Sequence, residues 1–192
     1  IEDCYVVYEA YGNSKEYKIK TTYKGKEVGI IGKRAFKNHT KLKKVDFGEN
    51  SNIFFIEAGA FFNCNSLETF FLPNSVVRIE NNAFASCTSL KEFTFEEDSK
   101  LKSISGSMFI NCHSLKTIVL PKTITEIGTF AFFNCYSLES ITIPFNTLNI
   151  YDDVFFNCNE LKEIVFLNFS TNTSKDWLGN LNPDNITILY QK

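Results

Sequence analysis

Apolar residues recur along this chain at fixed distances from one column of small side chains. The column holds cysteine in five units and histidine in the first, with a phenylalanine three residues ahead each time. Its members are His39, Cys64, Cys87, Cys112, Cys135 and Cys158. The steps between them are 25, 23, 25, 23 and 23 residues. Such a period is typical of arrays in which each repeat is one turn of a solenoid, and we predict that architecture.

Further apolar columns predict a strand in every unit. Eight residues before the cysteine column stand Ile31, Ile56, Ile79, Ile104, Ile127 and Ile150. Three residues after it stand Leu42, Leu67, Leu90, Leu115, Leu138 and Leu161. Apolar residues also occupy the positions six and eight after it, with a column of mixed polar and apolar residues between them. Because side chains alternate across a strand, we expect the first, fourth and sixth residues counted from the leucine to point inward.

The segment ahead of each cysteine lacks strand alternation. In Ala-Phe-Phe-Asn-Cys at residues 60–64, a small residue stands before a large one and a short polar residue stands before the cysteine. This order predicts a helical or 3₁₀ turn on the side opposite the strand, with the first phenylalanine in the interior. We expect the short polar residue to hydrogen-bond the turn backbone.

Two kinds of corner follow the strands. Pro73, Pro121 and Pro144 come directly after the strands of repeats that take 23 residues, and proline ends a strand because it lacks an N–H and has a fixed φ. The two repeats of 25 residues have no proline there, and their corners read Gly-Glu-Asn-Ser at 48–51 and Glu-Glu-Asp-Ser at 96–99. The longer corners therefore use two more residues.

These residues resemble a known repeat family. Ala-Phe-Phe-Asn-Cys-Asn-Ser-Leu at 60–67, with Leu72 and Pro73 after it, and Phe-Ile-Asn-Cys-His-Ser-Leu at 109–115 are similar to the BspA-like leucine-rich repeat, also called the Treponema pallidum type. The likeness extends over residues 17–167. It implies a β-rich α/β solenoid, a right-handed superhelix of parallel strands and short helical turns, with about six repeats of 23–25 residues plus caps.

The resemblance also implies a location and a partner. Proteins of this family are mostly cell-surface or secreted proteins of bacteria and parasitic protists, and several are implicated in adhesion. It therefore implies a cell-surface or secreted location and a protein partner such as a host extracellular-matrix or cell-surface protein. A cytoplasmic location is the alternative.

We expect a single domain over residues 1–192. Residues 1–23 would form an N-terminal cap, 24–167 the repeats and 168–192 a C-terminal cap. The only tryptophan, Trp177, would cover the last coil, whose apolar edge would otherwise meet water.

Charge and hydropathy exclude two classes of partner. The chain has 20 Lys and Arg against 22 Asp and Glu, a net charge of −2, so it lacks the basic footprint of a nucleic-acid-binding protein. Hydrophobic residues make up 44% of the chain but never form the run of about 18 that a membrane helix needs. We expect no direct membrane insertion of this segment.

The cysteines favour packing over chemistry. None has the close spacing of zinc ligands, and stacked columns would hold their side chains parallel, which is poor geometry for a disulfide. We predict a ladder of buried free thiols that act as small apolar groups, with His39 closing it near solvent and Cys4 outside it. No metal or cofactor is expected.

A catalytic interpretation has little support. Cys112 beside His113 is the one close cysteine–histidine pair, and adjacent residues tend to face different ways. No nucleophile elbow, P-loop or zinc-protease motif occurs. We predict that the chain is not an enzyme and has no catalytic residues.

The outward strand positions are the candidate binding site. The column seven residues after the cysteine column contains Asp46, Phe71, Thr94, Val119, Thr142 and Val165. Exposed Phe71, Val119 and Val165 would be unusual on a strand face that binds no partner. Apolar residues flanked by mixed charge are typical of protein-binding surfaces. The simpler interpretation is that β-branched residues merely favour strands. An intracellular scaffold or regulatory module, or a structural spacer in a larger surface protein, would also fit this sequence.

Overall fold

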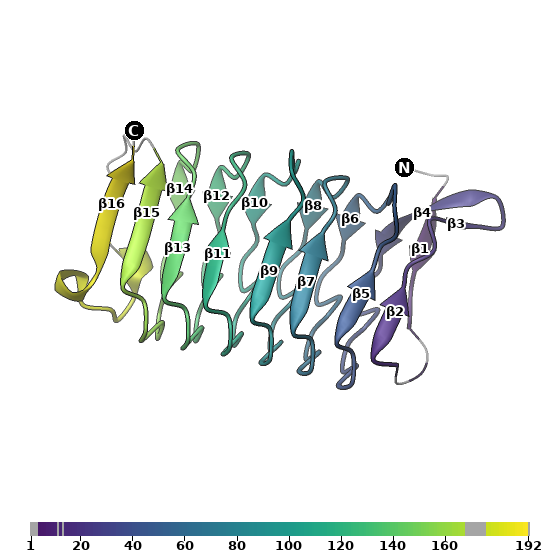
Figure 1. The fold of residues 1–192 in the computed structure, drawn as a ribbon, viewed down its shortest axis with the longest axis horizontal. Coiled ribbons are helices and arrows are strands. Elements are labelled where there is room, and N and C mark those ends of the chain that lie inside the picture. Colours follow the sequence, from purple (N-terminus) through teal and green to yellow (C-terminus); the bar gives the residue numbers. More distant parts are fainter. Residues whose placement is uncertain (1–3, 11, 13, 168–175, 192) are drawn as a thin grey trace.

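The chain winds into a parallel β-solenoid of about eight turns. The computed structural model describes residues 4–10, 12, 14–167 and 176–191. Two rows of short strands run the length of the molecule, and the two termini lie at opposite ends (Figure 1). The fold is therefore built by stacking one coil on the next.

The row in front in Figure 1 forms what we call the strand face. Its strands are β2 (Glu16–Lys18), β5 (Lys44–Asp46), β7 (Thr69–Leu72), β9 (Glu92–Phe95), β11 (Thr117–Val119), β13 (Ser140–Ile143), β15 (Glu163–Leu167) and β16 (Thr187–Gln191). They are parallel where they pair, and equivalent columns face each other, as with Ile118 and Ile141. The predicted strands are confirmed, and the structure adds their register.

A second row, here called the opposite row, lies behind the first. Its strands are β1 (Tyr5–Val7), β4 (Lys26–Ile31), β6 (Phe55–Ile56), β8 (Arg78–Ile79), β10 (Ser103–Ile104), β12 (Glu126–Ile127) and β14 (Asn149–Ile150). The isoleucine column lies in these strands, and Ile104, Ile127 and Ile150 pair in register. The remaining elements are β3 (Thr22–Tyr23), which pairs antiparallel with β4, and two 3₁₀ helices, Asp176–Leu178 and Pro183–Asn185.

The two rows enclose one core. On β7 and just before it, Leu67, Phe70 and Leu72 are buried, whereas Thr69 and Phe71 are exposed. This alternation confirms the inward positions predicted from the leucine.

A ladder of stacked phenylalanine rings fills the interior. Its members are Phe36, Phe61, Phe84, Phe109, Phe132 and Phe155, all fully buried, with centroids of successive rings 4.9 to 5.9 Å apart. Tyr17 contacts the first ring edge-on at 5.0 Å, and Trp177 contacts the last at 5.8 Å. Trp177 is 3% exposed, so it covers the last coil as predicted.

Successive single turns replace the predicted helical turn within the repeats. The N–H of Phe62 donates to the carbonyl of Gly59, and that of Cys64 to the carbonyl of Phe61, at 2.9 and 3.2 Å. These bonds have the i to i+3 spacing of a 3₁₀ turn, but Gly59 and Asn63 have φ of +62° and +58°. These residues with positive φ interrupt the helical backbone, so no continuous helix forms among the described residues of the repeats.

The polar column before the cysteines owes its composition to that backbone. Asn38, Asn63, Ser86, Asn111, Asn134 and Asn157 all have φ between +58° and +62°, where asparagine is the best-tolerated side chain after glycine. The side chains of the five asparagines bond to one another between adjacent coils rather than to the turn backbone. For example, Asn134 Nδ2 donates to Asn111 Oδ1 at 2.8 Å. The hydrogen-bond partner predicted for the asparagines of this column was therefore wrong.

A glycine pair allows two coils to approach closely after β10 and β12. A Cβ added at Gly128 would lie 2.6 Å from the backbone nitrogen of Gly106. We expect Gly128→Ala to lower the free energy of unfolding by about 1–3 kcal/mol, because backbone would have to move. Chemical denaturation measures this change. Gly106→Ala is the control, since its Cβ would meet nothing closer than 3.4 Å, and equal losses in the two variants would contradict the account.

Both end segments continue the coil. The N–H of Ala10 donates to the carbonyl of Ala35, and that of Phe155 to the carbonyl of Trp177. The first and last described segments thus form coils like those of the repeats, although their sequences lack the repeat pattern. The boundaries expected for the caps stay a prediction, and residues 168–175 of the C-terminal one lie outside the described residues.

Candidate functional site

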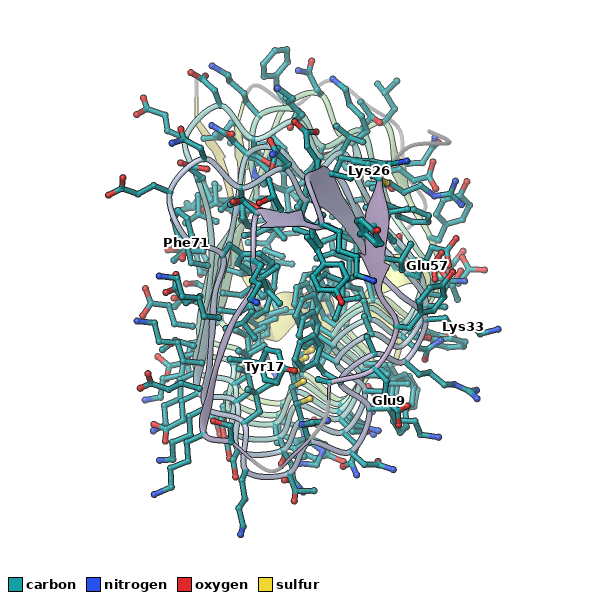
Figure 2. All side chains as sticks on the ribbon, turned by 90° about the vertical axis from the view of Figure 1, so that its right-hand side faces the viewer. Glu9, Tyr17, Lys26, Lys33, Glu57 and Phe71 are labelled. Atoms are coloured by element: carbon teal, nitrogen blue, oxygen red, sulfur yellow. The ribbon has the colours of Figure 1, made fainter. Side chains whose placement is uncertain are left out.

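The outward column of the strand face holds the candidate site residues. Phe71 is 51% exposed and Val119 is 68% exposed, and Asp46 is also exposed. Thr94 and Thr142 are half-buried. Figure 2 looks along the array from its N-terminal end and shows Phe71 on the outer side of the strand face, away from the interior where the sulfur atoms lie.

Val165 differs from the prediction, because only 8% of it is exposed. It lies on β15, which is paired on both sides, so that Thr142 flanks it on one side and Leu189 on the other. Val119 has a paired neighbour on one side only, Thr142. The sequence column does not show whether a strand is paired on one side or on both. Val165 is therefore not an exposed contact residue, contrary to the prediction.

A row of alternating charges lies beside the outward column. Glu68 bonds Lys43 at 2.8 Å and Lys91 at 3.1 Å, and Lys116 lies 3.7 Å from Glu139. Hydrogen bonds from the two lysines lower the pKa of the Glu68 carboxyl. Ion pairs this exposed contribute little to stability, so this row is a solvated border of the candidate site.

The strand face is not one continuous sheet. Backbone ladders join β2 to β5, β7 to β9, and β11 through β13 and β15 to β16, but β5 is not paired with β7, nor β9 with β11. Both gaps lie where the repeats take 25 residues. Strands separated by 23 residues are joined by a backbone ladder. The two unpaired junctions, here called the openings, therefore coincide with the longer corners.

Each opening contains a groove. The groove between β5 and β7, here the first groove, has a volume of about 600 Å³ and is lined in part by Asp46, Glu49 and Phe71. The groove between β9 and β11, the second groove, has a volume of about 450 Å³. It is lined in part by Glu92 and Val119. The two most exposed apolar residues of the outward column thus belong to the groove walls. The sequence showed the longer corners but not their effect on the ladder.

The cysteines form the predicted buried ladder of free thiols. Each thiol donates to the carbonyl of the phenylalanine in the preceding coil, as Cys112 Sγ does to Phe84 at 3.3 Å. Burial raises the pKa of the five thiols of the ladder, to about 12 for Cys64 and Cys158. His39, half-buried beside the Phe36 ring, stands at the start of the column.

The adjacent cysteine and histidine have separate environments. Cys112 is fully buried, whereas the ring of His113 stacks on Tyr136 with centroids 4.8 Å apart. A protonated, enclosed thiol is a poor nucleophile, so Cys112 contributes to packing. Over residues 4–10, 12, 14–167 and 176–191, no three His, Cys, Asp or Glu side chains gather as metal ligands would. The same residues contain no helix long and apolar enough to cross a bilayer.

The fold and its columns define a leucine-rich-repeat solenoid, a class that is typically non-enzymatic and generally mediates protein–protein interaction. The family described as BspA type leucine rich repeat region matches residues 8–100 and 98–191, with six copies. The chain therefore belongs to this family and is a protein-interaction repeat module.

Solved structures agree with this assignment. A Treponema pallidum leucine rich repeat protein has 28% identity and a TM-score of 0.77, over 83% of this chain and 76% of that one. A leucine-rich repeat protein from Eubacterium ventriosum has 24% identity and a TM-score of 0.68, over 86% and 40%. A leucine rich cell surface protein from Faecalibacterium prausnitzii has 26% identity and a TM-score of 0.57, over 81% and 48%. The chain thus spans less than half of the last two. The curated proteins include no match.

Proposed function

We propose that this chain is a non-enzymatic protein-binding module that uses the outward column of the strand face. The contact residues are Asp46, Phe71, Thr94, Val119 and Thr142. Val165 is left out of the set because it is buried.

The exposure of Phe71 and Val119 is the observation that carries this proposal. Both project from an ordered strand, and both line a groove rather than a flat stretch of sheet. Apolar side chains that stay in water are stabilised when a partner covers them, and well-packed aromatic anchors contribute much of the energy of protein interfaces. The charged row beside them resembles the polar rim of such an interface.

A cell-surface or secreted adhesion role is the biological setting that we propose. The description of the Faecalibacterium prausnitzii relative as a cell surface protein supports it. The partner would then be a host extracellular-matrix or cell-surface protein. The alternative is an intracellular scaffold or regulatory module. The buried free thiols suit it equally well, because reduced cysteines are the norm in the cytosol.

A pull-down with intact cells, extracellular-matrix proteins and cytosolic extract tests the proposal. Three immobilised forms are compared: the wild type, Phe71→Asp/Val119→Asp, and the control Phe145→Asp/Leu148→Asp. The control changes charge and hydropathy in a similar way at a corner, where Phe145 is 52% and Leu148 60% exposed.

We expect the strand-face variant to lose the protein that the wild type and the control retain. The compartment of that protein separates an adhesin from a scaffold. Equal capture by all three folded forms would place the site elsewhere, and no capture by any of them would favour the structural spacer.

A further inference from the structure

The two grooves of the strand face have unpaired backbone along their walls. At paired junctions, the N–H of Lys91 donates to the carbonyl of Glu68 and that of Glu139 to the carbonyl of Lys116. The corresponding bonds, from Glu68 to Lys43 and from Lys116 to Lys91, are absent across the two openings in the described part of the chain. The carbonyls of Lys43 and Lys91 lie just outside the groove linings. The strands that do line the grooves are also not joined across the openings, β5 to β7 or β9 to β11, so their backbone groups on that side have no ladder partner and can bond to a chain from outside.

Acidic residues outnumber basic ones on the groove walls. Six acidic residues line one or both of the grooves: Asp46, Glu49, Glu92, Glu96, Glu97 and Asp98. The linings also contain two lysines, Lys44 and Lys122. The net charge of the two linings together is therefore 2 − 6 = −4, although the whole chain carries only −2. Lys122 already pairs with Asp98 at 3.5 Å. Negative charge is thus concentrated at the openings, beside the exposed apolar residues.

Free acceptors, carboxylates and apolar walls together suit one kind of occupant. Arginine and lysine side chains carry only donors, and arginine forms strong charge-assisted bonds with carboxylates. Their aliphatic stems also pack against apolar surface, here Phe71 and Val119. An acidic or neutral segment would leave the carboxylates uncompensated.

The spacing of the grooves limits the shape of the occupant. Two strands, β7 and β9, separate them, so their centres lie about 10 Å apart at about 4.8 Å per strand. A polyproline II segment rises about 3.1 Å per residue with three residues per turn, which puts residues i and i+3 on one face about 9 Å apart. Basic residues three positions apart would therefore reach both grooves.

We propose that the strand face binds an extended basic segment of a partner protein, in which two arginine or lysine residues three positions apart enter the two grooves. This inference rests on the proposed function and specifies the partner of the same site. Apolar residues between the two basic ones cover Phe71 and its neighbour Thr94, and the stem of the basic residue in the second groove packs against Val119. The neighbouring lysines, Lys43 and Lys91, are held by Glu68 and lie outside both groove linings.

Peptide binding followed by fluorescence anisotropy tests the inference. The probe is Pro-Arg-Pro-Leu-Arg-Pro, and the control peptide Pro-Arg-Arg-Leu-Pro-Pro has the same composition with adjacent arginines. The groove variant is Glu49→Gln/Glu92→Gln/Glu97→Gln, three exposed residues. Glu96 is kept because its carboxylate accepts the N–H of Asn74 at 2.8 Å. The control variant, Glu9→Gln/Glu126→Gln/Asp152→Asn, makes the same charge change away from the grooves, on β12 of the opposite row and just after β1 and β14.

We expect the wild type and the control variant to prefer the spaced peptide, and the groove variant to bind it at least about tenfold more weakly. High salt should weaken binding to the wild type. Equal affinity for the two peptides, no measurable binding, or an unchanged affinity of the groove variant would overturn the inference. If a protein captured through Phe71 and Val119 still binds the groove variant fully, the inference fails while the proposed function stands.

Discussion

Phe84→Ala lowers the free energy of unfolding by about 3–5 kcal/mol, because it opens a cavity in the middle of the phenylalanine ladder. The Phe84 ring is fully buried and stacks between Phe61 and Phe109, with centroids at 5.1 and 5.9 Å. It also meets Phe70 and Phe93 edge-on at 4.6 and 5.0 Å. Coils are stabilised only by their neighbours, so the loss weakens two interfaces at once.

Urea denaturation followed by circular dichroism measures this loss. Phe145→Ala serves as the control, since that ring is 52% exposed and lies on a corner. A change of less than about 1 kcal/mol in Phe84→Ala would contradict the ladder as the main source of core packing, because a cavity left by a buried ring costs more.

Alkaline pH unfolds the protein by acting on the thiol ladder. Burial raises the pKa of the five ladder thiols, to about 12 for Cys64 and Cys158, whereas an exposed thiol titrates near 8.5. Between these values the unfolded chain has released protons that the native state retains. Stability therefore falls as pH rises, by about 1.4 kcal/mol per pH unit for each thiol, and this effect is absent below about pH 8.

The free energy of unfolding, measured at several values of pH from 7.5 to 10.5, checks this expectation. Lysine and tyrosine also titrate in the upper part of this range, so the informative comparison is with Cys87→Ala/Cys135→Ala. We expect the variant to be less stable at neutral pH but to lose stability less steeply with pH. Parallel curves for the two proteins would show that the ladder thiols are not the groups responsible.

The column pattern predicted most of the fold for a physical reason. A buried position that recurs in every coil packs against the same position of the next coil, so it keeps the same kind of residue. The columns that contain Phe84 and Leu90 could therefore be recognised as buried from the sequence alone. The opposite row was missed because strands of two residues, such as Phe55–Ile56, are too short to show alternation. The isoleucine column was the available signal, since β-branched residues favour strands.

Local backbone geometry was the second feature that the sequence did not predict. The asparagine column indicated turns, but its positive φ is visible only in the structure. One member of a second such column is unexpected. Phe130 has φ of +59°, at a position that other repeats give to residues such as Gly59 and Asn82. Its ring is 38% exposed and meets Phe133 edge-on at 5.5 Å, and no feature of the column predicted it.

The candidate site was predictable in composition but not in shape. The outward column could be counted from the cysteines, which gave Phe71 and Val119 correctly as exposed side chains. The burial of Val165 depends on pairing with β16, which lies beyond the recognisable repeats. The grooves depend on which ladders stay closed, and the sequence shows only that two corners are longer.

Amide hydrogen exchange of the protein, with and without the partner captured by the wild type, tests the central claim most directly. The account predicts that protection on binding is confined to the strand face, strongest around the openings that β5, β7, β9 and β11 border. Protection confined to the opposite row, from β4 to β14, would contradict the claim that this solenoid binds proteins through its strand face.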